Sequence, residues 1–505
     1  MVEMLMDQLG GFVTILNPAT LLFLIAGACL GSVIGALPGM GAAAGTSILL
    51  PLTLVLSPID GLVMLAGIYY GTQFGGGITS IMLNVPGTAG AAITAMDGYA
   101  LMKKGRGGAA LGMSQIASFS GGMLSTLVLT FTGVALARVA LKFGQAEYFV
   151  LTLMGLLLVT SMTGDYPVKG YTMLVLGLLL GYIGLDTIST VRRFTFGNIY
   201  LSDGLNNVPV LIGMFGFSEI LFTMEKDLKM AYDSLKTTKI RPKDLIPTKK
   251  DMQDSWPAIL RGTVFGFVVG ALPGAGATIA SLMGYSYQKN HSPNKDIYGE
   301  GAIDGIAVSE SSNNASTSGA MVPMLALGIA GSPTTAILLT ALSMYGIQYG
   351  PQLYTTSGTL VWALIASVYL GNIIVVLFNI GFIPCFAKFL SAVERFLIPG
   401  IAVVCIVGVY SLKARMFEVW VMLLFAVVGY FLRKADFPML PMILGLILGP
   451  TAEAAFRKAL IQSGGNFSAF VTRPLSCAML LVCVVCVVLQ IRRTMVSSKS
   501  KKGGL

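Results

Sequence analysis

Charged residues are scarce in this chain. They make up only 11% of its 505 residues, while hydrophobic residues make up 55%; an average soluble domain has about 25% and about 45–50%. So few charges cannot cover the surface of a water-soluble protein of this length. Apolar runs of about 20 residues recur instead, each long enough to cross a hydrocarbon core. The runs are continuous rather than alternating, which excludes a transmembrane barrel and predicts an all-α polytopic membrane protein.

Histidine and patterned cysteine are nearly absent as well. The single histidine, His291, lies in a polar stretch, and the six cysteines lack metal-ligand spacing. We therefore expect no metal site and no bound cofactor. Phosphate-binding loops and the common catalytic motifs are missing, so we expect no catalytic residues and no enzyme. The net charge of +10 is concentrated in short connections and at the C-terminus, as the positive-inside rule requires, which argues against a nucleic-acid partner.

The distribution of charge divides the chain. No Lys or Arg precedes Lys103, and no charged residue occurs in the stretch 311–387. We expect about ten to twelve membrane segments. The predicted units are a first membrane repeat (1–224), a polar cytoplasmic connection (225–256), a second membrane repeat (257–450), and a C-terminal membrane segment with a basic cytoplasmic tail (451–505).

Two glycine motifs occur in both halves in the same order. GALPGMG at 35–41 recurs as GALPGAG at 270–276, an offset of 235 residues (273 minus 38), and PGT at 86–88 matches AGS at 330–332, an offset of 244 (331 minus 87). Loops that are basic in one half lack Lys and Arg in the other. Under the positive-inside rule this pattern predicts two inverted-topology repeats. Chance similarity between Gly- and Ala-rich helices is the alternative.

These motifs place proline and glycine inside apolar runs. Such a break frees backbone groups that lipid cannot satisfy, so we expect re-entrant or broken helices that face each other across a substrate site. Residues 257–288 fit a re-entrant hairpin with arms of about 24 and 18 Å. Residues 19–37 are long enough to span, so a hairpin and a crossing both remain open there. A simple kink or close packing through small residues would also explain the motifs.

The second motif predicts the start of a new helix in each half. Ser332 is the expected N-cap with Pro333 as the first helical residue, and Thr88 is the corresponding cap in the first half. A helix N-terminus presents free amides and about half a positive charge. Four such ends, two per repeat, would attract an anion without any buried Lys or Arg. Plain capping without a ligand is the alternative.

Polar side chains lie close to these motifs. Asn84 precedes Pro86, and the polar run 309–318 contains Asn313 and Asn314. The run either supplies groups to the substrate or a coupling cation, or forms a solvated loop. Another segment, 208–224, is moderately amphipathic and is expected at the membrane surface.

Three acidic residues near the motifs could carry a proton: Asp97, Asp304 and Glu310. For Asp97, a salt bridge at the helix end with Lys103 or Lys104 is an equal alternative.

Four stretches carry a family resemblance, which extends from about Leu21 to Leu448. They are GALPGMGAAAG, YYGTQFGGGITSIMLNVPGTAGAAITAMDGYALMKKG, GALPGAGATIASLMGYSYQK and SSNNASTSGAMVPMLALGIAGSPTTAILL. In them the chain resembles the large membrane subunit of tripartite tricarboxylate transporters, the TctA family. The resemblance implies a multi-pass permease of the bacterial inner membrane. It also implies uptake of a carboxylate from a periplasmic solute-binding protein, a small membrane subunit as partner, and symport with Na⁺ or H⁺. Ala330 departs from the family, which usually has proline there.

We therefore expect a secondary transporter that moves a small, citrate-like di- or tricarboxylate by alternating access between the repeats. A membrane enzyme acting on a lipid-type substrate and a non-transporting scaffold subunit are the alternatives. The predicted substrate- or ion-binding residues are Pro38, Gly39, Gly41, Asn84, Pro86, Gly87, Thr88, Pro273, Gly274, Gly276, Asn313, Asn314, Gly331 and Ser332.

Overall fold

The chain is almost entirely helical. The computed structural model describes residues 2–161, 167–186, 188–225, 240–292, 295–485 and 487–488. Within these ranges the only sheet is a ribbon of β1 (Gly184–Leu185) and antiparallel β2 (Arg192–Arg193). Five described helices are long and apolar enough to cross a membrane. The prediction of an all-α polytopic membrane protein is therefore confirmed, while the number of crossings remains a prediction. The five are α2 (Pro18–Gly35), α6 (Gly107–Ala140), Gly358–Phe386 of α17, α18 (Met416–Lys434) and α19 (Met439–Gln462).

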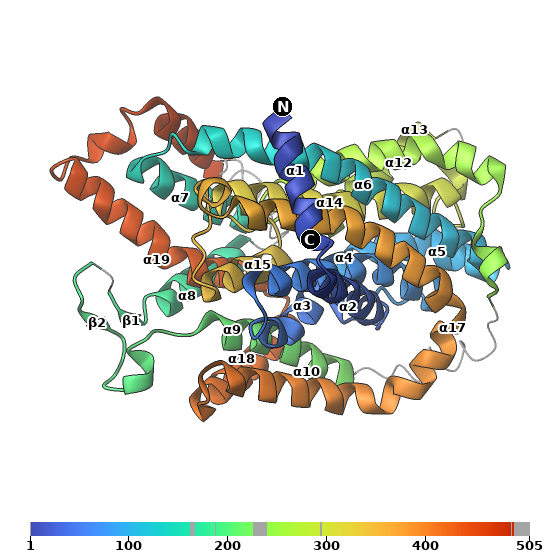
Figure 1. Cartoon of the computed structure of the whole chain (residues 1–505), viewed down its shortest axis with the longest axis horizontal. Coiled ribbons are helices and arrows are strands. Elements are labelled where there is room, and N and C mark those ends of the chain that lie inside the picture. Colours follow the sequence, from blue (N-terminus) through green and yellow to red (C-terminus); the bar gives the residue numbers. More distant parts are fainter. Residues whose placement is uncertain are drawn as a thin grey trace, which may run out of the picture.

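The two halves repeat one order of elements, in which a helical hairpin is followed by an interrupted helix and a long helix (Figure 1). In the first half these are α2 and α3 (Gly41–Thr53), then α4 (Pro58–Leu83) with the short η1 (Ala89–Ala91) and α5 (Ala92–Lys103), then α6. In the second half they are α12 (Lys249–Gly270) and α13 (Gly276–His291), then α14 (Ile303–Leu327) with α15 (Pro333–Met344), then α17 (Gly358–Lys413).

The remaining elements lie before, between and after these two sets. They are α1 (Val2–Ile15), α7 (Gln145–Ser161), α8 (Pro167–Gly181), η2 (Ile199–Leu201), α9 (Asn207–Leu211), the π-helical η3 (Ile212–Phe217), α10 (Ser218–Glu225), η4 (Pro242–Leu245), η5 (Lys295–Ile297), α16 (Leu353–Thr356) and η6 (Phe467–Phe470). A further apolar helix covers Pro474–Val485.

Glycines spaced by four residues pack the hairpin against the interrupted helix in each half. A Cβ atom on any of these glycines would overlap the facing helix, in most cases at a backbone carbonyl oxygen, so only glycine allows the helices to approach this closely. The partners in the two halves differ by the same offsets of 235 and 244 residues as the motifs, so the repeat is structural as well as sequential. The pairs are Gly27–Met64, Gly31–Ile68 and Gly35–Thr72 in the first half, and Gly262–Val308, Gly266–Ser312 and Gly270–Ser316 in the second.

The hairpin of the second half is longer than predicted. Thr248 caps α12, and its side chain and that of Asp251 form a reciprocal capping box. The cap starts the helix inside the stretch 225–256 that was expected to be only a connection. Most of that stretch, residues 226–239, and the basic tail from residue 489 lie outside the described residues, so the predicted division of the chain is not tested.

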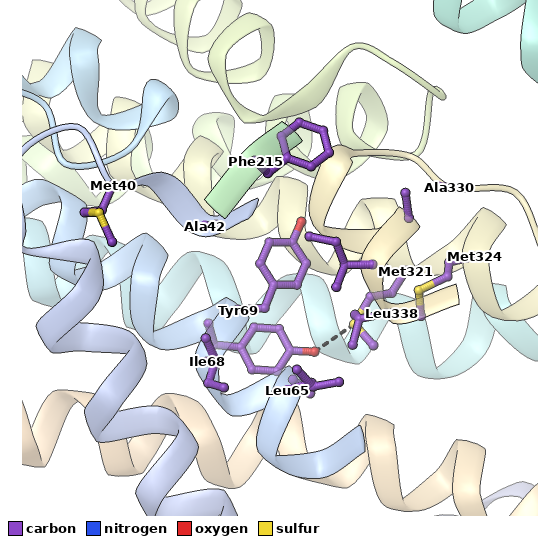
Figure 2. Packing of buried hydrophobic residues seen from close by; sticks show 14 of the residues in the cluster. Met40, Ala42, Leu65, Ile68, Tyr69, Phe215, Met321, Met324, Ala330 and Leu338 are labelled. Carbon is purple, nitrogen blue, oxygen red and sulfur yellow. Dashed lines mark hydrogen bonds between the residues drawn. The ribbon is translucent and has the colours of Figure 1, made fainter. Parts of the chain in front are cut away.

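The segment 208–224 does not lie at a surface as expected. Residues 208–216 are buried, and α9, η3 and α10 pack against α18. The prediction was wrong because the face that looked polar meets other protein elements rather than headgroups. Phe215 of η3 instead joins the main hydrophobic cluster with Tyr69, Met321 and Leu338 (Figure 2).

Candidate functional site

The first glycine motif forms a tight turn between two helices in each half. Gly39 and Gly41 have φ of 82° and 58°, and Gly274 and Gly276 have 87° and 64°. These left-handed conformations are open to glycine without steric cost. The turn ends one helix and immediately begins the next, α3 at Gly41 and α13 at Gly276.

The second motif interrupts α4 and α14 at equivalent positions. Asn84 ends α4 with φ of 56°, and Gly328, 244 residues later (328 minus 84), ends α14 with φ of 71°. A left-handed residue after the last helical turn is a common helix end, and Asn is the usual substitute for Gly there. Four further residues then lead to the next helix start in each half.

Within each half the two interruptions contact each other through the backbone. The Gly39 N–H donates to the Pro86 carbonyl at 3.3 Å and the Gly41 N–H to the Gly87 carbonyl at 2.9 Å. In the second half the Gly274 N–H donates to the Gly331 carbonyl at 3.1 Å. These bonds satisfy part of the irregular backbone, which membrane depth otherwise makes costly.

The four helix starts line a single cavity of about 600 Å³. Each contributes its first residues to the wall, so their amides and positive dipole ends surround the same space. The contributing stretches are Gly41–Ala44 of α3, Thr88–Gly90 at η1, Gly276–Thr278 of α13, and Ser332–Thr334 of α15.

Ser332 is the N-cap of α15, as predicted. Its Oγ accepts from the Thr335 N–H at 3.2 Å, and its own N–H donates to Thr335 Oγ1 at 2.8 Å. Thr88 stands at the equivalent position before η1, but its hydroxyl makes no capping bond. The predicted capping by Thr88 was therefore wrong, because the chain there first forms a 3₁₀ turn. Its buried Oγ1 has no hydrogen-bond partner in the described part of the chain.

Comparison with known proteins decides the family. The family described as "Tripartite tricarboxylate transporter TctA family" matches residues 21–444. The chain belongs to the TctA family. It is therefore the large subunit of a tripartite tricarboxylate transporter and a multi-pass membrane protein.

Two relatives from Agrobacterium vitis are similar to this TctA protein. The "Uncharacterized 52.8 kDa protein in TAR-I ttuC' 3'region" is 38% identical over 503 residues, 99% of each chain. The "Uncharacterized protein in TAR-II ttuC' 3'region" is 37% identical over 224 residues, which are 44% of this chain and 93% of the relative. No solved structure matches the chain.

The predicted residues divide into two groups. Eight line the cavity: Gly39, Gly41, Pro86, Gly87, Thr88, Gly274, Gly276 and Ser332. The others lie behind its wall or at its turns: Pro38, Asn84, Pro273, Asn313, Asn314 and Gly331.

The polar run 309–318 is a buried part of α14 and not a solvated loop. Asn314 Nδ2 donates to the Glu310 backbone carbonyl at 3.1 Å, so its amide serves its own helix. Asn313 lies against Gly90, at which a Cβ would overlap its Oδ1. Because Gly90 lines the cavity, Asn313 lies directly behind the wall.

Sequence reasoning missed the remaining part of the wall. Tyr69 and Gln73 reach the cavity from α4, and the Tyr69 hydroxyl lies 3.2 Å from Ser332 Oγ. Other lining residues come from elements outside the two repeats, namely Phe215, Glu219, Arg433, Pro438, Met439 and Leu440.

An ion pair of Arg433 (α18) and Glu219 (α10) forms one side of this wall. The Arg433 guanidinium also lies over the Phe222 ring, 4.5 Å from its centroid. The other Glu219 oxygen, Oε1, is buried without a hydrogen-bond partner among the described residues and faces Gly39. The cavity thus contains a side-chain cation, which the sequence analysis did not expect. The available signal was a charged residue at the end of an apolar helix.

Asp97 has a structural role between the halves. Its Oδ1 accepts from the N–H groups of Gly299, Gly301 and Ala302 at 2.8–2.9 Å, and its Oδ2 accepts from the Tyr285 hydroxyl at 2.7 Å. These partners replace the salt bridge with Lys103 or Lys104 that was one of the two predicted alternatives.

We expect the Ser332→Ala variant to be less stable by about 1 kcal/mol, the usual loss for a deleted N-cap. The reason is that the first amides of α15 lose their hydroxyl acceptor. Thermal unfolding of the purified protein in detergent measures the effect. The Ser332→Thr variant keeps a capping hydroxyl and serves as the control. Equal unfolding temperatures for Ser332→Ala and the unmodified protein would contradict the capping role.

Proposed function

We propose that this TctA protein is the permease subunit of a binding-protein-dependent secondary transporter in the bacterial inner membrane. It imports a small, citrate-like di- or tricarboxylate by alternating access. A gradient of H⁺ or Na⁺ drives the uptake. Its partners are a periplasmic solute-binding protein and a small membrane subunit.

The observation that carries this proposal is the convergence of four helix starts on one cavity. Their dipole ends supply positive potential at fixed positions, and half-helix N-termini that point at anionic substrate groups are a recurring device of secondary transporters. The volume of about 600 Å³ is within the range of small-molecule sites. Arg433 adds one guanidinium, whose planar donors match a carboxylate.

The cavity also separates this proposal from its alternatives. An enzyme acting on a lipid-type substrate would need acids or bases grouped at the reacting bond, whereas the cavity wall carries one acid, Glu219, already paired with Arg433. A scaffold subunit has no use for a polar cavity at the meeting point of two repeats.

Uptake into proteoliposomes tests the proposal. The chain is reconstituted with its small membrane subunit and binding protein, and labelled citrate, succinate, malate and tartrate are supplied under imposed H⁺ and Na⁺ gradients. We expect accumulation of at least one of them, and exchange of labelled for unlabelled substrate without a gradient. A scaffold or an enzyme would give neither, so the absence of both would overturn the proposal.

A further inference from the structure

Glu310 is a fully buried carboxylate at the contact between the two halves. It lies on α14 with 0% exposure. Its Oε1 accepts from Thr94 Oγ1 of α5 at 2.7 Å, and its Oε2 accepts from Ser118 Oγ of α6 at 3.0 Å. Because α5 and α6 belong to the first half, one carboxylate of the second half is held by hydroxyls of the first.

The groups around this carboxylate are neutral. Besides Thr94 and Ser118, Asn313 lies beside it, and Ser114 Oγ packs with Glu310 Oε1 against Gly77. In the described ranges no Lys, Arg or His contacts Glu310. The titratable groups of the helices packed on α14 have other partners: Tyr69 with Ser332, Tyr70 with Met321, Asp97 with Tyr285, Lys103 with Tyr99, Arg106 with Asp251, Arg261 with Gln288, and Asp304 with Tyr298.

An isolated carboxylate without a counter-charge is costly to keep ionised away from water. The neutral acid is free of this cost. Hydroxyl groups suit both forms, because a hydroxyl donates to the carboxylate and accepts from the carboxylic acid after a rotation. The surroundings of Glu310 therefore permit the loss and gain of a proton without rearrangement of the helices.

Polar groups connect Glu310 to the cavity. Asn313 is one helical turn further along α14, and its Oδ1 lies against Gly90 of the cavity wall. Neither this oxygen nor Ser114 Oγ has a hydrogen-bond partner in the parts of the chain that are described. Buried polar atoms of this kind are rare in folded proteins and need a reason. A path for a proton between the cavity and Glu310 supplies one.

We propose that Glu310 is the proton-binding residue that couples transport in this protein. This inference rests on the proposed function. Glu310 takes a proton from the cavity when the cavity is open to the outside, and the same proton leaves to the inside water after the carboxylate has crossed.

A proton fits this position better than Na⁺. The Na⁺ sites of related transporter architectures use carbonyl oxygens that a helix break has released. Glu310 lies within the uninterrupted helix Ile303–Leu327, well before the break at Gly328, so the carbonyls around it are used by the helix itself.

The Glu310→Gln variant tests the proposal, because glutamine resembles the protonated acid and cannot release a proton. In proteoliposomes containing the complete transporter, we expect exchange of labelled for unlabelled citrate, or of whichever panel member is accumulated, to continue. Accumulation driven by an inward proton gradient falls to the level measured without a gradient. The matched control is Glu300→Gln, an exposed position near the start of α14, which keeps both activities.

Proton-driven accumulation by Glu310→Gln at the unmodified level would overturn the proposal. So would accumulation by the unmodified protein with a Na⁺ gradient alone. Where Glu310→Gln also loses exchange, Ser118→Ala decides: a shifted pH profile of exchange supports the proposal, and an unchanged profile overturns it.

A spectroscopic readout separates this proposal from the proposed function. The infrared spectrum of the purified protein should contain a carbonyl band of a buried carboxylic acid that Glu310→Gln removes and Glu300→Gln keeps. If no carboxylate of the panel is accumulated, the proposed function fails, and the infrared band still decides whether Glu310 binds a proton. Identical spectra for both variants would overturn the proton site.

Discussion

We expect the Gly87→Leu variant to lose carboxylate uptake while remaining in the membrane at normal abundance. A Cβ at Gly87 would overlap the Gly35 carbonyl oxygen and would lie 2.9 Å from the Gly76 Cα. The loop must therefore move away from α2, and the 2.9 Å hydrogen bond from the Gly41 N–H to the Gly87 carbonyl is lost. The larger side chain also occupies part of the cavity. Overpacking of this kind typically costs about 1–3 kcal/mol.

The equivalent position in the second half should behave in the same way. A Cβ at Gly331 would lie 3.0 Å from the Ala320 Cα and 3.2 Å from the Gly270 carbonyl oxygen, so Gly331→Leu also displaces its loop. Uptake into proteoliposomes and the amount of inserted protein are measured together. The control is Gly381→Leu on α17, because nothing lies within 4 Å of a Cβ at that exposed position. Normal uptake by both loop variants would contradict the assignment of the cavity as the substrate site.

The second large effect is expected from Arg433→Gln. The substitution removes the cation from the cavity wall and leaves the Glu219 carboxylate without its partner. An uncompensated carboxylate repels an anionic substrate, so we expect the apparent affinity to fall by about 2–5 kcal/mol, as for truncated buried charge pairs. Concentration dependence of uptake gives this value.

The neighbouring residue provides the control for Arg433. Lys434 also ends α18, but it pairs with the half-exposed Glu225 at 2.7 Å, and it does not line the cavity. Lys434→Gln therefore removes the same charge from the same helix without changing the site, and its uptake should stay near that of the unmodified protein. The double variant Arg433→Gln with Glu219→Gln should recover part of the affinity. If Arg433→Gln and Lys434→Gln behave alike, Arg433 does not act on the substrate.

The parts of the site that the sequence predicted correctly are those with local causes. A left-handed turn requires glycine, and a serine followed by proline begins a helix, so Gly39, Gly274 and Ser332 could be placed without knowledge of the tertiary structure. The repeat then placed their counterparts. The capping role of Thr88 failed because the helix start in the first half has a 3₁₀ turn, which no residue pattern indicated.

The other wall of the cavity could not be predicted, because it depends on which distant segments pack together. Glu219 and Arg433 are more than two hundred residues apart (433 minus 219), and each looks like the end of an ordinary membrane helix. The segment containing Glu219 was even placed at the membrane surface. Only the packing of α10 against α18 brings the two charges to the same side of the cavity.

The polar run on α14 shows how small side chains can be buried without a ligand. Ser309, Ser311 and Ser316 each donate to a carbonyl three residues earlier, at 2.7–3.2 Å. This local bonding satisfies hydroxyls inside a helix, so a run that looks fit for solvent can form a core element. The sequence alone left both possibilities open for this reason.

The cavity has two walls of different chemical origin. At the paired glycine turns the surface consists of peptide groups fixed by hydrogen bonds between loops, so it recognises charge with little dependence on side-chain identity. The opposite side is made of the side chains of Phe215, Glu219, Arg433, Met439 and Leu440. A transporter built in this way can acquire a new cargo through changes on the second side alone, while the peptide surface that attracts the anion stays as it is.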